Sequence, residues 1–253
     1  MCVLNARLNS QVSRLFLTIT RTRIEVCRCA GIRAGTLFGL ALCAGALLVA
    51  SPAHAIVGGS PSSKPWVVGV IDIENGVLNT VCSGAAISAQ LVVTAKHCPA
   101  SAVVFANRTA TIASRHDIPG EGRDTSVLVL TAPHPLTEYP KLSRVEEPLL
   151  LPGTEGSVYG YGSVFSEIRE QRELKFTVST SSDGSANLQG DGRMEAGDSG
   201  APWLINGELV GVHHGEEKGN AGSYDFDSIW YALDIIKTLE YQLKAHAVAA
   251  SDL

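Results

Sequence analysis

The 253-residue chain lacks a long apolar run at its N-terminal end, because the apolar stretch at 35–50 is shorter than the roughly 20 residues that cross a bilayer as a helix. Six arginines precede this stretch, and Ala53 and Ala55 follow it with the spacing of a signal-peptidase site. We therefore predict that residues 1–55 form an export signal that is removed after Ala55. An uncleaved N-terminal anchor is the alternative interpretation.

Cysteine is almost absent after residue 55. Four of the six cysteines lie within the predicted signal, so only Cys82 and Cys98 remain. In an exported chain two such cysteines are expected to form one disulfide, and two free buried thiols are the alternative. A bridge that closes a loop of roughly 15 residues contributes about 3 kcal/mol in the chain-entropy treatment.

Basic residues are also scarce after residue 55. Residues 1–55 hold six arginines and one glutamate, so the rest keeps 14 of the 20 basic and 24 of the 25 acidic residues, a net charge near −10. Such an acidic surface argues against nucleic acid or an anionic membrane as a partner. The 198 residues left after the signal can form a sizeable core, in one compact unit or two small fused ones.

Short β-type runs separated by Gly, Asp and Pro dominate the chain after the signal, which favours an all-β sandwich or barrels. We expect strands at 66–73, 91–93, 103–105, 109–112, 127–130, 175–178 and 209–212. The C-terminus differs, because apolar residues recur near the helical period and predict a helix over about 233–247. Prolines cluster at 140–152, where we place the junction between two halves.

Four short motifs follow one another along the chain, and the last places a serine between an aspartate and small residues, as expected for an exposed nucleophile on a tight turn. In order they supply a free N-terminus, a base, an orienting acid and a nucleophile. The motifs are Ile56-Val57-Gly58-Gly59, Thr94-Ala95-Lys96-His97-Cys98, Asp124-Thr125-Ser126-Val127-Leu128 and Gly197-Asp198-Ser199-Gly200-Ala201-Pro202. This arrangement resembles the trypsin/chymotrypsin-like serine peptidases over nearly everything after residue 55.

The resemblance implies an all-β fold of two six-stranded antiparallel Greek-key barrels followed by a C-terminal helix. The N-terminal barrel would span about 56–145, and the second barrel with the helix about 146–253. The resemblance also implies the Cys82–Cys98 bridge, because in this family it holds the loop that carries the catalytic histidine.

The same resemblance assigns the catalytic roles. A serine hydroxyl is a poor nucleophile at neutral pH and needs a base, which in turn needs an orienting group. By resemblance, Ser199 attacks the carbonyl, His97 takes its proton, and Asp124 holds the tautomer of His97. Asp117 competes with Asp124 for the role of the acid. Asp124 is favoured because small residues and a continuous apolar strand follow it, as in the family's pattern.

Two further features complete the expected machinery. The backbone N–H groups of Gly197 and Ser199 would form the oxyanion hole, and such donors contribute a few kcal/mol each to the transition state. In the family, a free N-terminus of the Ile-Val-Gly-Gly type pairs with the aspartate before the serine, here Asp198. Because the predicted cleavage falls directly before Ile56, we hypothesise that export processing itself creates the activating N-terminus.

The segment that ends in His213, His214 and Gly215 matches the strand that lines the family's specificity pocket. His213 falls where glutamyl-specific members have the histidine that contacts the substrate carboxylate, and Arg193 falls at the pocket floor. Two basic groups would favour Glu or Asp before the scissile bond. Gly215 would pair with the substrate backbone as an added strand.

The basic pocket has alternatives. Arg193 can be a solvated loop charge, and nearby Glu195, Glu216 and Glu217 can neutralise it or repel acidic peptides. His213 can be a plain core histidine. Ligand-like spacing is lacking around His213 and His214, so no metal is expected, and the resemblance implies no cofactor.

The sequence therefore predicts an exported serine endopeptidase, secreted or periplasmic, that acts on proteins or peptides as a monomer. After signal removal we expect no stable membrane association. An esterase is one alternative, although residues 197–201 depart from the Gly-x-Ser-x-Gly elbow. A peptidase-fold protein retained for binding is the other.

Overall fold

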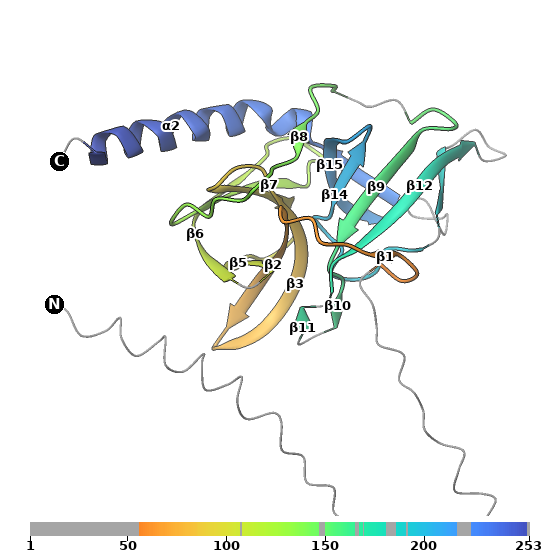
Figure 1. Ribbon diagram of the computed structural model, residues 1–253, viewed down its shortest axis with the longest axis horizontal. Helices are drawn as coiled ribbons and strands as arrows, with labels where there is room; N and C mark the ends of the chain where they lie inside the picture. The colour runs from red at the N-terminus through yellow and green to blue at the C-terminus, as the bar shows by residue number, and fades with distance from the viewer. Residues whose placement is uncertain are drawn as a thin grey trace, which may run out of the picture. The chain divides into compact units, whose positions relative to one another are not determined.

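The computed structural model describes residues 56–251, with gaps at 107, 147–149, 165–166, 169, 181–185, 191 and 217–223 (Figure 1). The predicted export signal at 1–55 lies outside the described residues. The described part is mostly β, as predicted, and its strands fall into two groups that lie side by side.

The N-terminal half is a closed six-stranded barrel in which all neighbouring strands are antiparallel, with the order β2-β3-β4-β7-β6-β5. The fourth strand in chain order, β5, pairs with the first, β2, and this gives the strand order of a Greek key. The strands are β2 (Val67–Glu74), β3 (Val77–Ala86), β4 (Leu91–Ala95), β5 (Ala102–Phe105), β6 (Arg108–Asp117) and β7 (Thr125–Leu130). This confirms the predicted first barrel.

Strands β4 and β7 are buried at every position, which is why both appear in the sequence as continuous apolar or small-residue runs. One face of each strand fills the barrel, and the other face meets the second half of the protein. Leu209 and Val212 from that half, with Ile229 and Ile236, belong to the same buried cluster as the barrel residues. The two strands next to the predicted base, His97, and the predicted acid, Asp124, are therefore buried on both faces.

The C-terminal half is an eight-stranded sheet whose main path, β1-β12-β9-β14-β15-β16, has six strands. At the sides of this path β13 pairs with β12, and β8 pairs with β15 in parallel. A second buried cluster, centred on Trp203, lies against this sheet and includes Ile56. The strands are β1 (Ser60–Pro61), β8 (Lys141–Leu142), β9 (Glu155–Gly160), β12 (Arg172–Thr180), β13 (Ala186–Gly190), β14 (Pro202–Ile205), β15 (Glu208–Glu216) and β16 (Tyr224–Ser228).

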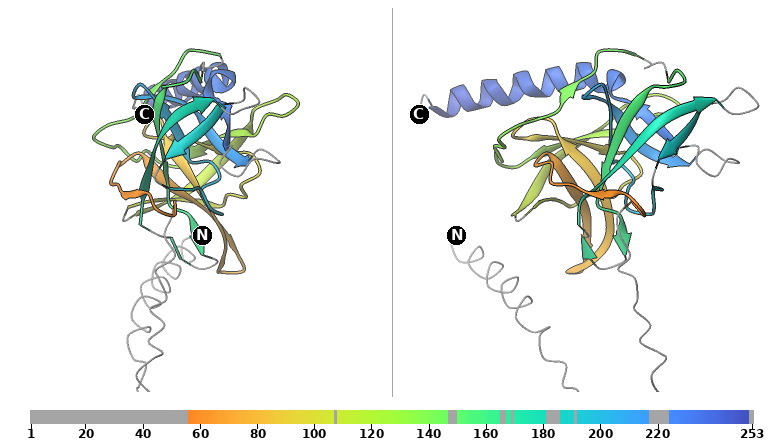
Figure 2. Two further views of the ribbon diagram at one scale, coloured as in Figure 1. Left: turned by 90° about the vertical axis from the view of Figure 1, so that its right-hand side faces the viewer. Right: turned by 45° about the vertical axis from the view of Figure 1, so that its right-hand side comes forward.

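Two features link the halves. The short strand β1 comes from the beginning of the described chain but pairs with β12 of the second sheet, beside which it lies in Figure 2. A separate hairpin, β10 (Ser163–Val164) and β11 (Glu167–Ile168), follows β9, and its strand β10 lies against β3 of the barrel. The N-terminal segment that includes Ile56 is thereby held on the second sheet.

The C-terminal helix was predicted over 233–247 and is found at Leu233–Ser251 as α2, after the 3-10 turn η1 (Ile229–Ala232). Its first turns bury Ile236 and Leu239, whereas Tyr241 is 76% exposed. Its far end projects away from the body of the protein (Figure 1). Among the described residues, no helix combines the length and apolar character needed to cross a membrane.

Candidate active site

The ends of β4 and β7 bring His97 and Asp124 together. The register pairs Ala95 with Thr125, so the residues just beyond each strand meet at the same edge of the barrel. The His97 Nδ1 atom lies 2.6 Å from Asp124 Oδ2, and the His97 backbone N–H donates to Oδ1 at 2.8 Å. Both oxygens of the carboxylate are thus directed at one histidine.

The electrostatics of this pair define the histidine tautomer. Burial alone would raise the pKa of Asp124, but the two His97 hydrogen bonds outweigh it and hold the pKa below its usual value. The carboxylate is therefore ionised near neutral pH, so it accepts a hydrogen bond from Nδ1–H. This leaves Nε2 of neutral His97 free to accept a proton.

Asp117, the competing candidate for the acid, lies elsewhere. Its carboxylate accepts hydrogen bonds from Arg115 Nε, at 2.7 Å, and from the Ser126 hydroxyl. Burial alone would raise the pKa of Asp117, but these donors outweigh burial and hold the pKa below its usual value. Of the two aspartates, Asp124 is therefore the one paired with His97.

The loop that carries His97 is clamped on both sides of the histidine. The Arg115 guanidinium donates from Nη1 to the Cys98 carbonyl at 2.6 Å and from Nη2 to the Lys96 carbonyl. Cys98 also forms the expected disulfide with Cys82. The histidine is thus fixed by one cation and one covalent link, of which only the second could be anticipated from the sequence.

The turn that carries Ser199 is fastened to the barrel through β3. The Ser199 carbonyl accepts from the Ser83 backbone N–H at 2.8 Å, and the Ser83 hydroxyl donates to the Gly197 carbonyl at 2.9 Å. Gly200 has φ +78°, and a Cβ there would lie 2.3 Å from the Ser83 carbonyl oxygen, so only glycine fits. The Cys98 sulfur lies 3.8 Å from the Ser199 carbonyl, a contact without a proton because the sulfur is in a disulfide.

Two backbone donors flank Asp198. The Asp198 N–H is used internally, because it donates to the Glu195 carbonyl at 3.0 Å. Within the described part of the chain, neither the Gly197 N–H nor the Ser199 N–H has an acceptor. Gly197 has φ +92°, a conformation that suits glycine and turns its N–H relative to its neighbours. Two such donors on the Ser199 turn are what an oxyanion would require.

The Asp198 side chain is fully buried and points away from this turn. Its Oδ2 accepts from the Ile56 nitrogen at 3.3 Å and from the Glu195 N–H at 2.9 Å, and its Oδ1 accepts from the Gly162 N–H at 2.9 Å. Burial raises the pKa of Asp198 to about 6 despite these donors. In the 253-residue chain the Ile56 nitrogen is a peptide amide, so it brings no positive charge to this carboxylate.

A cavity of about 430 Å³ adjoins Ser199 and contains both predicted basic groups, Arg193 and His213. Arg193 Nε is 2.7 Å from Glu195 Oε1, and Glu195 also lines the cavity. His213 is 5% exposed, and its ring stacks over Trp203 with 6.3 Å between centroids. The cavity wall is thus basic with one internal counterion.

The next two residues of β15, His214 and Gly215, lie in different surroundings. Gly215 lines the cavity, as predicted, whereas His214 is not among its lining residues. Instead, His214 Nδ1 lies 3.8 Å from Asp124 Oδ2, on the side of the orienting acid. The pairing of β15 with β16 shifts register between His213 and Gly215, and this irregularity changes which way successive side chains face.

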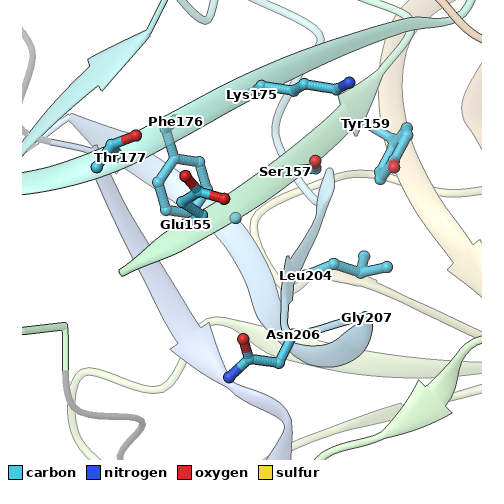
Figure 3. A pocket seen from close by; sticks show the side chains of 10 residues that line it. Glu155, Ser157, Tyr159, Lys175, Phe176, Thr177, Leu204, Asn206 and Gly207 are labelled. Carbon is cyan, nitrogen blue, oxygen red and sulfur yellow. The ribbon is translucent and has the colours of Figure 1, made fainter. Parts of the chain in front are cut away.

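A larger cavity, of about 650 Å³, lies on β9, β12 and the β14–β15 turn and holds none of the predicted site residues (Figure 3). The hydroxyls of Ser157 and Tyr159, which line it, already donate to Glu173 at 2.8 and 2.9 Å. Both hydroxyls therefore have a partner within the protein, and the cavity shares no lining residue with the cavity beside Ser199.

Comparison with known proteins agrees with this fold and gives the family. The family model described as Trypsin matches residues 56–229, and the chain belongs to the trypsin family of serine peptidases. An uncharacterized peptidase of Corynebacterium glutamicum (strain R) is 29% identical over 188 residues, which cover 66% of this chain and 64% of the relative. The chain thus spans somewhat less than two thirds of the curated relatives it matches.

Solved structures show the same fold. The scabies mite inactivated protease paralogue S-D1 is 22% identical with a TM-score of 0.59, over 73% of this chain and 97% of its own. Human heparin binding protein is 23% identical with a TM-score of 0.58, over 72% and 96%. Mouse neuropsin, a serine protease, is 17% identical with a TM-score of 0.56, over 73% and 98%. At these identities the likeness concerns the fold alone.

Proposed function

We propose that this trypsin-family protein is an exported serine endopeptidase in which Ser199, His97 and Asp124 form the catalytic triad. The observation that carries the proposal is the His97–Asp124 pair, in which Nδ1 and Oδ2 are 2.6 Å apart, beside a serine turn with two unused backbone donors. The pair leaves Nε2 as the basic nitrogen of the site, and the turn provides the place where negative charge can develop.

The proposed reaction uses these groups in sequence. His97 Nε2 takes the Ser199 proton as the hydroxyl oxygen attacks the peptide carbonyl, and the carbonyl oxygen becomes an oxyanion held by the N–H groups of Gly197 and Ser199. The imidazolium, stabilised by Asp124, then gives its proton to the leaving amine. Water, activated by the same histidine, hydrolyses the acyl-enzyme and regenerates the serine.

Activation in this proposal follows from cleavage between Ala55 and Ile56. Ile56 has φ +38°, which is unfavourable for a β-branched residue, and this torsion ceases to exist once the preceding peptide bond is cut. The same cut converts the buried amide near Asp198 into an ammonium that neutralises the carboxylate. Removal of the export signal thus relieves a strained torsion and supplies the missing cation in one step.

For specificity we propose a preference for Glu or Asp before the scissile bond. Arg193 Nε is occupied by Glu195, but within the described residues its two terminal nitrogens have no acceptor and can bind a carboxylate. His213, in the same cavity, can add a second donor. Gly215 lines the same cavity, and among the described residues nothing lies within 4 Å of where its Cβ would be, so an extended peptide can add to β15 there.

The proposal is tested by reacting the protein that begins at Ile56 with a fluorophosphonate, followed by mass spectrometry of the labelled peptide. We expect one adduct at Ser199 that is absent in His97→Ala, because phosphonylation requires an activated serine. A protein that folds but leaves Ser199 unlabelled would instead be a binding protein of this fold. Labelling with hydrolysis of esters and not of peptides would favour the esterase.

A further inference from the structure

Asp227, on β16, is a buried carboxylate outside every predicted motif, and its side chain is 3% exposed. Its two oxygens accept hydrogen bonds from three consecutive residues. Oδ1 accepts from Arg123 Nη1 at 3.0 Å, and Oδ2 accepts from the Asp124 backbone N–H at 3.1 Å and from the Thr125 hydroxyl at 2.7 Å. One carboxylate of the second sheet thus holds the whole segment that carries the candidate triad acid.

The charge of Asp227 is compensated locally. The Arg123 guanidinium is its ion-pair partner and also lies 3.3 Å above the ring of Tyr231. Burial alone would lower the pKa of Arg123, but Asp227 outweighs it, and the pKa is raised. A buried carboxylate with a fixed cation and two further donors is a stable anchor and not a group that needs a ligand.

Asp124 is consequently held from two directions. Its side-chain oxygens are engaged by His97, whereas its backbone N–H is engaged by Asp227. Asp227 lies on β16 of the second sheet, whereas Asp124 immediately precedes β7 of the barrel. The orientation of the triad acid therefore depends on the junction between the two halves, and Asp227 is the group that spans it.

We propose that Asp227 is a positioning residue, which fixes the Asp124 backbone so that both carboxylate oxygens face His97. This inference rests on the proposed serine-peptidase function, in which that alignment sets the basicity and orientation of His97. Within the described part of the chain Asp227 makes no hydrogen bond to His97 and does not line the cavity beside Ser199, so it acts through the Arg123–Thr125 segment that carries Asp124.

The test compares Asp227→Ala with Glu173→Ala in the protein that begins at Ile56. Glu173 is the control, because it is a half-buried carboxylate that likewise accepts from side-chain hydroxyls, those of Ser157 and Tyr159. A misplacement of about 1 Å can cost about a hundredfold in rate, so we expect Asp227→Ala to lower kcat by about ten- to a hundredfold with little change in KM. Glu173→Ala should keep the wild-type kcat.

Proton NMR gives a second readout that does not depend on turnover. The short His97 Nδ1–H···Asp124 hydrogen bond should give a far-downfield resonance in wild type and Glu173→Ala, and this resonance should be lost or shifted in Asp227→Ala. If Asp227→Ala does not fold, Thr125→Val removes one donor with little change of shape and should shift the same resonance and lower kcat.

An unchanged kcat and an unchanged downfield resonance in folded Asp227→Ala, or in Thr125→Val where that variant replaces it, would overturn the positioning role. Failure of the proposed function has a different signature, because the wild-type protein itself would then leave Ser199 unlabelled by fluorophosphonate. In that case loss of the resonance in Asp227→Ala would still support the role of Asp227 in aligning the pair.

Discussion

The Ile56 nitrogen and the Asp198 carboxylate meet at 3.3 Å in a place where neither residue is exposed to solvent. In the proposed activation, the contact joins an amide to a buried acid before cleavage and an ammonium to a carboxylate after it. The two states differ by a full charge in a buried site, so the contact can control activity in this proposal. Its consequences can be measured separately for the extended and the processed chain.

The extended chain, in which residues precede Ile56, should be destabilised by Asp198 at neutral pH. Burial raises the pKa of Asp198 to about 6 in the folded state, above the ordinary value of 3.8. The stability gained by keeping Asp198 protonated is therefore fully present below pH 3.8 and is lost as pH rises through about 6. This difference corresponds to about 3 kcal/mol. In urea unfolding at pH 7, Asp198→Asn should therefore be more stable than the extended parent, and the gap should close near pH 4.

The processed chain should respond in the opposite sense. With the Ile56 ammonium in place, Asp198→Asn removes an ion-pair partner and leaves a buried cation, so activity should fall at least about a hundredfold. Activity of the parent should also decline at alkaline pH as the amine, whose ordinary pKa is about 8, loses its proton. Equal activity of the extended and processed chains would contradict this account of activation.

Arg115 should be needed for the geometry of the His97 loop. Arg115→Lys cannot reproduce the fork that joins the Lys96 and Cys98 carbonyls, so we expect about 1–3 kcal/mol lower stability and a lower kcat. Arg108→Lys is the matched control, because Arg108 is exposed at the other end of the same strand. Denaturant unfolding measures the stability and steady-state kinetics measure kcat. Equal losses in the two variants would contradict the proposed role of Arg115 in holding the His97 loop.

How much of this site the sequence can predict is clearest from Asp117 and Asp124. Local pattern favours Asp124, but what separates the two is the β4–β7 register, which brings Asp124 to His97 and leaves Asp117 beside Arg115. Motif order identifies the strand ends that carry the chemistry. It does not identify Arg115, Ser83 or other supports, because these are ordinary residues whose roles arise only when distant strands pack.

The fold, too, could be predicted from the sequence only in part. Continuous apolar runs predicted β4, β5 and β7 well, and the helical period of the C-terminus predicted α2. Strand β3 was missed because Val77–Ala86 mixes glycine, asparagine and alanine, and its pairing on two sides outweighs its weak β pattern. The orientation of His214 also escaped prediction, because it depends on a register shift that leaves no mark in the sequence.

Gly200 and Gly207 give a matched test of the serine turn. They have nearly the same φ, +78° and +77°, but a Cβ on Gly200 would meet the Ser83 carbonyl at 2.3 Å, whereas nothing lies within 4 Å at Gly207. Gly207→Ala should cost about 1–2 kcal/mol and keep activity. Gly200→Ala should cost more and abolish fluorophosphonate labelling of Ser199, since the turn must move away from β3. Equal losses would contradict the fastening of the turn through Ser83.

The charge balance of the specificity cavity can be shifted through Glu195. Glu195→Gln removes the counterion of Arg193 and should raise kcat/KM for substrates with Glu before the scissile bond, by about three- to thirtyfold. Arg193→Met should lower it by a similar factor. If neither change alters the preference among Glu, Asp, Gln and Leu substrates, Arg193 is a solvated loop charge.

The central claim is tested most directly by digestion of a mixed peptide library with the protein that begins at Ile56, using Ser199→Ala as the blank. The account predicts cleavage after Glu or Asp that is absent in the blank. Cleavage after other residues would retain the triad and discard the basic pocket. Absence of any cleavage by a folded wild-type protein would contradict the proposed endopeptidase.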